Sequence, residues 1–250
     1  MTDFHRMRKV EMILRWLSEI HTREHGLQQH LLTGPPPVTT RMAWGRSDVR
    51  LRSNAVVHFT TGANMAVTLT RYRFSAEDYD EMIDFGIIEE DERVELIRGE
   101  IVHKMPIGKS HIAVVNRLTR LLIQLIGDHA QVSVQNPIRL NNSEPEPDVS
   151  LLRFQDDFYD SAKPVGGDVL LVIEVSDASL ETDRDIKREL YAEASIVEYW
   201  IVNLIDGCVE VHRQPQPNGT YSEMFVAKRG DTIPMVSLPQ FALKVDQILG

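Results

Sequence analysis

The chain has 250 residues, 42% of them hydrophobic, and its 27 basic and 37 acidic side chains give a net charge of −10, which argues against tight nonspecific binding to DNA. This length suffices for one domain with a full core, while the single cysteine, Cys208, excludes an internal disulfide and a cysteine-based zinc site. No apolar run approaches the ~20 residues that span a bilayer and no signal peptide is recognisable, so we expect a soluble cytoplasmic protein without membrane contact.

Residues 1–64 differ in charge from the rest of the chain. They hold nine Lys and Arg against five acids, a net of +4, so residues 65–250 carry −14. Residues 10–32 have the pattern of an amphipathic helix, which Gly34 and three prolines would end. This segment is either a basic arm that touches DNA or a poorly ordered extension that results from a misplaced start codon. We favour the extension, and we expect the domain to span residues 65–250.

The first element of that domain is a helix after Ser75. Ser75 and Asp78 have the spacing of a capping box, and Gly86 provides an end. The apolar spacing predicts that three side chains of this helix are buried, namely Tyr79, Met82 and Ile83.

A hairpin and a second helix follow. Residues 93–97 and 100–104 read as two strands joined by Arg98 and Gly99. We expect Ser110 to cap the next helix, whose core stripe begins at Ile112 and which ends before Gly127. His111 lies in its first turn, where it either bonds a phosphate or metal-bound water or is an ordinary surface residue.

The remaining elements predict a mixed α/β fold. Strands are expected over 132–140, 149–154, 168–175, 197–205, 209–213 and 221–228, a helix is expected from Asp183, and the tail is expected to pack on the sheet edge. A central mixed β-sheet flanked by helices accommodates this order.

Glu174 lies in the middle of a strongly apolar strand, where a carboxylate is costly to bury unless it is paired or binds a metal. Strand alternation puts Glu174 on one face with Val172 and Ser176. Asp148 follows a Pro-rich turn, where it either caps the turn or faces the same site.

Lys187 borders the apolar stripe of the next helix, with Ile186, Leu190 and Tyr191 at helical spacing. It forms either a helical ion pair with Asp183, four residues earlier, or a bond into a site with Asp148 and Glu174. Two carboxylates, an ammonium and a hard divalent cation are suitable for splitting a phosphodiester, because the cation neutralises the phosphate and activates a water.

These motifs resemble a known family. The order Pro147-Asp148, an apolar strand that ends in Glu174-Val-Ser, Asp183-x-x-x-Lys187-x-x-x-Tyr191-Ala-x-Ala and Val197-Glu-Tyr-Trp-Ile-Val is similar to the Uma-two family of endonucleases. That family is placed in the restriction-endonuclease-like PD-(D/E)XK superfamily. The resemblance covers the chain from Met65 onward.

The resemblance implies a restriction-endonuclease-like core and a Mg²⁺-dependent, or Mn²⁺-dependent, endonuclease that hydrolyses DNA. It implies that Asp148 and Glu174 bind the metal and that Lys187 stabilises charge, in place of the superfamily's usual Lys at the position of Ser176. Glu95, on the hairpin, is implied as a further acid, although a solvated hairpin carboxylate is the plain alternative. A homodimer is implied as well.

Two alternatives stay open at this point. In one of them, the substrate is RNA, or a structured or damaged DNA. In the other, the chain is a catalytically inactive nucleic-acid-binding or interaction module that retains the nuclease fold, as Ser176 and the acidic charge suggest.

Overall fold

The computed structural model describes residues 71–89 and 91–250. These residues belong to two compact units, of which the larger comprises residues 74–80 and 91–250 and the smaller includes residues 71–73 and 81–89. The predicted helix at 10–32 and the predicted domain start at Met65 lie outside the described residues. The larger unit contains every residue that the sequence proposes for the site.

Helix α2 (Ala76–Asp84) begins with the predicted capping box. The backbone N–H of Asp78 donates to Oγ of Ser75 (3.1 Å), and the N–H of Ser75 donates to Oδ2 of Asp78 (2.9 Å). Tyr79 and Met82 are buried as predicted, but Ile83 is 38% exposed, so that prediction was wrong. The buried face of this nine-residue helix is narrow and contains Tyr79 and Met82, which are three residues apart. Ile83 follows Met82 and lies about 100° further round the helix axis, so its side chain is outside this face.

The predicted hairpin is confirmed as β1 (Val94–Ile97) and β2 (Glu100–His103), which pair antiparallel as a separate two-stranded sheet. Arg98 and Gly99 connect them, and both have positive φ (52° and 78°). Two residues with positive φ form the turn whose twist matches that of the flanking strands. All four residues of β1 are buried, including Glu95.

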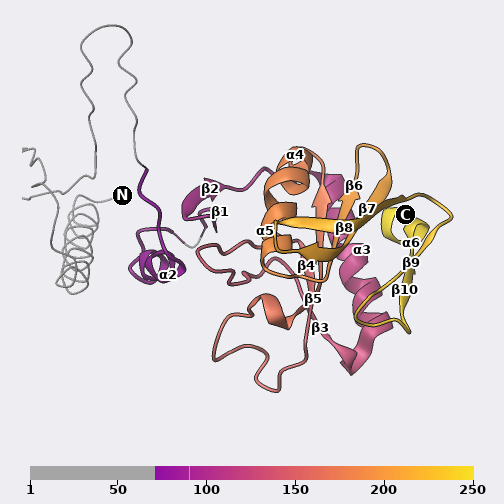
Figure 1. Ribbon diagram of the computed structural model, residues 1–250, viewed down its shortest axis with the longest axis horizontal. Coiled ribbons are helices and arrows are strands. Elements are labelled where there is room, and N and C mark those ends of the chain that lie inside the picture. Colours follow the sequence, from indigo (N-terminus) through magenta and orange to yellow (C-terminus); the bar gives the residue numbers. More distant parts are fainter. Residues whose placement is uncertain (1–70, 90) are drawn as a thin grey trace, which may run out of the picture. The chain divides into compact units, whose positions relative to one another are not determined.

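A six-stranded mixed sheet forms the centre of the larger unit (Figure 1). Its strands run in the order β3-β4-β5-β6-β7-β8, and only β5 and β6 pair in parallel. The bounds are β3 (Gln131–Ser133), β4 (Val149–Leu152), β5 (Val169–Ser176), β6 (Glu198–Asn203), β7 (Cys208–Gln216) and β8 (Thr220–Ala227). The predicted mixed α/β fold with a central mixed sheet is therefore confirmed.

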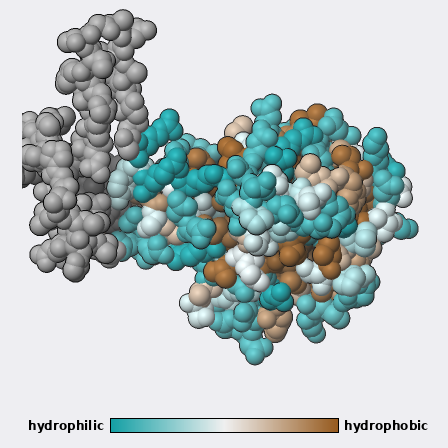
Figure 2. Space-filling view, viewed as in Figure 1, coloured by the Kyte–Doolittle hydropathy of each residue, from teal (hydrophilic) through white to brown (hydrophobic). Residues whose placement is uncertain are grey.

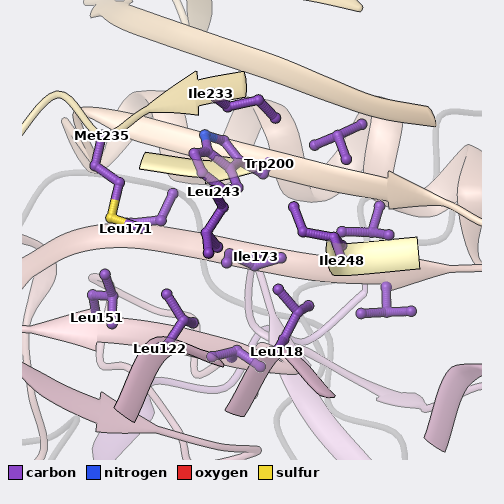
Figure 3. Packing of buried hydrophobic residues seen from close by; sticks show 14 of the residues in the cluster. Leu118, Leu122, Leu151, Leu171, Ile173, Trp200, Ile233, Met235, Leu243 and Ile248 are labelled. Atoms are coloured by element: carbon purple, nitrogen blue, oxygen red, sulfur yellow. The ribbon is translucent and has the colours of Figure 1, made fainter. Parts of the chain in front are cut away.

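One face of the sheet carries the larger hydrophobic core. Helix α3 (Lys109–Ile126) contributes Leu118 and Leu122, which pack against Ile173 of β5 and Trp200 of β6 (Figure 3). The C-terminal elements β9 (Thr232–Pro234), β10 (Ala242–Lys244) and α6 (Val245–Leu249) cover the same face. The tail was predicted to pack on the sheet edge. That was wrong, because its alternating apolar residues bury more surface against the face.

The other face is covered by a helical segment on the opposite side from α3 (Figure 1). It consists of α4 (Leu180–Thr182), a π-helical turn η4 (Asp183–Lys187) and α5 (Arg188–Glu193). Leu190 and Tyr191 pack there against Val172 of β5 and Tyr199 of β6. The alternation predicted for β5 is confirmed, because Ile173 and Val175 belong to the first core and Val172 to the second.

Two local predictions were wrong. Residues 132–140 do not form one strand, because Gln135 has φ +52° and Pro137 cannot donate to a ladder. Ser110 does not cap α3, since the helix begins one residue earlier with extended Gly108 as its N-cap, and Ile112 is exposed.

Hydrophilic residues cover most of the visible surface of the larger unit, and hydrophobic residues gather in small groups between them (Figure 2). Within the described residues, each helix is too short or too polar to cross a membrane.

Candidate active site

A cavity of about 270 Å³ lies in the larger unit and brings together the four proposed site residues. Its walls come from the β1–β2 hairpin, the loop after β2, the first turn of α3 and the helical segment that follows β5. Glu95, Asp148, Glu174 and Lys187 all line it, with His111 beside them.

Asp148 immediately precedes β4, where it is buried and held by three donors. Nε2 of His111 lies 2.8 Å from Oδ2, and the backbone N–H of Val175 donates to the same oxygen at 2.9 Å. The Gln135 amide donates to Oδ1 at 3.3 Å. Burial raises the pKa of Asp148, but the bonds from His111, Val175 and Gln135 outweigh burial and leave the pKa below its ordinary value. Asp148 is therefore a carboxylate at neutral pH.

Glu174 is 3% exposed and occupies the floor of the cavity. Its Oε1 accepts from Nζ of Lys187 (3.0 Å) and from the hydroxyl of Tyr191 (2.8 Å). Burial raises the pKa of Glu174 to about 8; Lys187 opposes this rise, while Asp183, Asp148 and Glu95 add to it. Because three carboxylates and one ammonium surround it, Glu174 favours the protonated form as long as no further cation is present.

Lys187 is buried at the end of η4 and reaches two carboxylates. Besides its bond to Glu174, its Nζ lies 3.4 Å from Oε1 of Glu95. Burial alone lowers the pKa of a lysine, but Glu174, Glu95 and Asp183 together raise the pKa of Lys187 above its ordinary value. Lys187 is therefore charged at neutral pH.

Glu95 is buried in β1 and is not a solvated hairpin carboxylate. Its Oε2 accepts from the backbone N–H of Glu146 (3.2 Å), two residues before Asp148. Through this bond the hairpin is fixed to the segment that carries Asp148. Glu146 in turn binds Lys104 (2.9 Å).

Asp183 does not form the helical ion pair that was the plain alternative for Lys187. Its Oδ2 instead accepts from the hydroxyls of Ser176 and Ser179, both at 2.7 Å. The π-turn that begins at Asp183 widens the helix, and such turns occur frequently at functional sites. Sequence reasoning missed Tyr191 as a partner of Glu174, although its four-residue spacing from Lys187 was a usable signal.

The donor set suits a hard divalent cation. Three carboxylates and one ammonium lie around Glu174: those of Glu95, Asp148 and Asp183, and that of Lys187. Oδ1 of Asp148 and Oε2 of Glu174 each have only a 3.3 Å hydrogen bond, so these oxygens have capacity for a ligand bond. In the part of the chain that the structure describes, no group of three or more His, Cys, Asp or Glu side chains has an arrangement that could hold a metal ion as it stands.

Residues 76–246 match a family model described as "Putative restriction endonuclease" (Uma2). The chain belongs to the Uma2 family. This confirms the resemblance that the motifs around Asp148, Glu174 and Lys187 indicated.

Among solved structures, the Uma2 domain is similar to a crystal structure titled as a "putative nuclease belonging to DUF820" from Anabaena variabilis ATCC 29413. The TM-score is 0.54 at 14% identity, over 70% of this chain and 97% of that chain. At this identity the likeness shows the fold alone. No curated protein matched the chain.

Proposed function

We propose that the chain is a metal-dependent endonuclease that hydrolyses DNA phosphodiester bonds. The observation that carries this proposal is the meeting of Asp148, Glu174 and Lys187 around one cavity. The Asp148 N–H lies 3.3 Å from Oε2 of Glu174, and Nζ of Lys187 lies 3.0 Å from Oε1 of the same carboxylate. Membership in a family of nuclease type supports the same chemistry.

In this proposal Asp148 and Glu174 hold Mg²⁺, for which Mn²⁺ can substitute. When bound, the cation neutralises a phosphate oxygen and lowers the pKa of a water. His111 and Val175 keep Asp148 anionic, so that it binds a cation and not a proton. A cation held there would compete with the proton of Glu174, whose pKa is raised by burial and, to a smaller extent, by Asp183, Asp148 and Glu95.

Lys187 supplies the positive charge that the reaction needs at the phosphate. In the hydrolysis, a water oxygen loses a proton and forms a bond to phosphorus while an ester P–O bond breaks and its oxygen leaves as a hydroxyl after taking up a proton; negative charge accumulates on the phosphoryl oxygens in between. Glu174 and Glu95 hold the ammonium of Lys187 at the cavity wall. In this proposal Lys187, which reaches Glu174 from η4, takes the role that Ser176, two residues after Glu174, cannot fill. Glu95 is the further acid of the site.

The test is cleavage of supercoiled plasmid and of circular single-stranded DNA by the full chain with Mg²⁺, Mn²⁺ or EDTA. Lys187→Ala is compared with Lys244→Ala, which removes an exposed lysine of β10. We expect metal-dependent cutting that only the Lys187 variant loses.

Removal of Lys187 leaves Glu174 without its cationic partner. If the carboxylate stays charged, the free energy of unfolding falls by about 3–5 kcal/mol. Cleavage is therefore measured well below the melting temperature of the variant, and Lys187→Arg is added because it keeps the charge and alters its position. Absence of cutting by the folded wild type on both DNAs and on RNA favours the inactive binding module. The predicted homodimer is tested in the same preparation by light scattering.

A further inference from the structure

Part of the mouth of the candidate active site is apolar, beside the exposed polar residues Arg93, His103, Asp177 and Thr182. The loop between β2 and α3 carries Met105, Pro106 and Ile107 on one wall, and Ile186 of η4 lies on another. Met105 is 49% exposed and Ile186 45% exposed. Single exposed apolar residues are common on protein surfaces, but here they gather at the opening of one cavity whose floor is charged.

The charges of this cavity do not attract the phosphates of DNA, which are the groups that a duplex mainly offers while its bases are stacked. Its lining includes six carboxylates, from Glu95, Glu146, Asp148, Glu174, Asp177 and Asp183. Against these stand Arg93, Lys104 and Lys187, of which Lys104 already binds Glu146 and Lys187 binds Glu174. Duplex binding depends on neutralising several phosphates with Lys and Arg. Affinity at this mouth must therefore come from contacts other than phosphate pairing.

From the apolar part of the mouth over an acidic floor, we infer that the cavity accepts an unpaired DNA strand, with bases against Met105, Ile107 and Ile186 and a phosphate at Lys187. This inference rests on the proposed function and names its substrate class. Met, Ile and Pro are among the side chains that proteins insert between bases when they unstack DNA. The faces of bases are accessible in an unpaired strand and covered in a duplex, so the apolar mouth discriminates between the two.

Binding is measured separately from cleavage. The full chain carrying Glu174→Gln is titrated in Mg²⁺ into a fluorescent 20-nucleotide single strand, the same strand in a duplex, and the same sequence as RNA, with anisotropy as the readout. We expect the single DNA strand to bind about tenfold or more tightly than the duplex. Ile186→Asp in this background should weaken single-strand binding about tenfold, because it removes an apolar contact with a base. Ile205→Asp is the matched control, because Ile205 is 64% exposed and does not line the cavity.

Equal or tighter duplex binding overturns the inference, and so does preference for RNA or an Ile186→Asp variant that binds like the control. Both variants are at exposed positions, so equal melting temperatures establish that they fold. Cleavage assays of the wild type separate this inference from the proposed function. Single-strand binding without any cutting contradicts the nuclease function alone, whereas cutting of relaxed duplex as fast as single-stranded DNA contradicts the inference alone.

Discussion

Asp148 and Glu174 hold each other across two adjacent strands of the sheet. The N–H of Asp148 donates to Oε2 of Glu174 (3.3 Å), and Val175, next to Glu174, donates its N–H to Oδ2 of Asp148 (2.9 Å). The antiparallel register of β4 and β5, which pairs Val149 with Ile173, puts the two carboxylates opposite each other. Their separation is therefore fixed by the central sheet and not by a loop.

His111 is expected to act as a positioning residue for Asp148. In His111→Ala, Oδ2 of Asp148 keeps only the Val175 N–H, so the pKa of Asp148 rises and a cation competes less well for the carboxylate. Loss of such a partner typically weakens metal binding 10–100-fold. Calorimetric titration with Mn²⁺ measures this change. His129→Ala is the control, since that ring contacts Phe241 and the Ile126 carbonyl at the far end of α3. Equal Mn²⁺ affinity in the two variants would contradict the role of His111.

The sequence could predict that Asp148, Glu174 and Lys187 meet, because two features can be read directly from it. These are the order of the motifs that carry the three residues and the alternation of side chains along β5. It could not predict the helical geometry that directs the side chain of Lys187 towards Glu174. The π-turn from Asp183 to Lys187 shifts the helical register, so Ile186 is exposed and not buried as its spacing suggested. That turn involves the Ser176 and Ser179 hydroxyls bonding to Asp183, which is a tertiary arrangement. The ambiguity of Glu95 has the same origin, because hairpin burial depends on the segment around Glu146.

Glu174→Gln should change the pH dependence of stability. The folded-state pKa of Glu174 is about 8 against an ordinary 4.5, so the metal-free wild type loses stability as pH rises between these values. The loss is at most on the order of 5 kcal/mol. Glutamine does not ionise, so the variant should gain stability relative to wild type from pH 5 to pH 8. Thermal melts in EDTA across this range measure the difference. Parallel curves for the two proteins would show that Glu174 does not titrate there.

Mg²⁺ should stabilise the wild type more at pH 8 than at pH 6. The proton and the cation compete for Glu174, and fewer protons are bound at the higher pH. A cation present at 100 times its dissociation constant adds about 2.7 kcal/mol. The shift in melting temperature between EDTA and Mg²⁺ buffers is measured at both pH values, with Asp148→Asn as the variant expected to lose it. A shift of equal size in that variant would mean that Mg²⁺ binds elsewhere.

His212 should limit the stability of the fold in acid, independently of the site. Its ring is buried beside Tyr199 and Tyr221, and neither ring nitrogen has a hydrogen-bond partner among the described residues. Burial, with Arg188 nearby, lowers the pKa of His212 to about 4. Between pH 6.5 and 4, the unfolded chain therefore binds a proton at His212 that the folded protein does not bind. The free energy of unfolding falls by about 3 kcal/mol as the pH falls through this range.

His212→Phe keeps an aromatic ring between the two tyrosines and removes both unpaired nitrogens. The variant should match or exceed wild-type stability at pH 7 and should exceed it increasingly towards pH 4.5. Urea unfolding at pH 7, 5.5 and 4.5 gives the three free energies of unfolding. His103→Phe, at an exposed position on β2, serves as the matched control and should follow the wild type at every pH. If His212→Phe also loses stability in parallel with the wild type, the acid sensitivity lies in other groups.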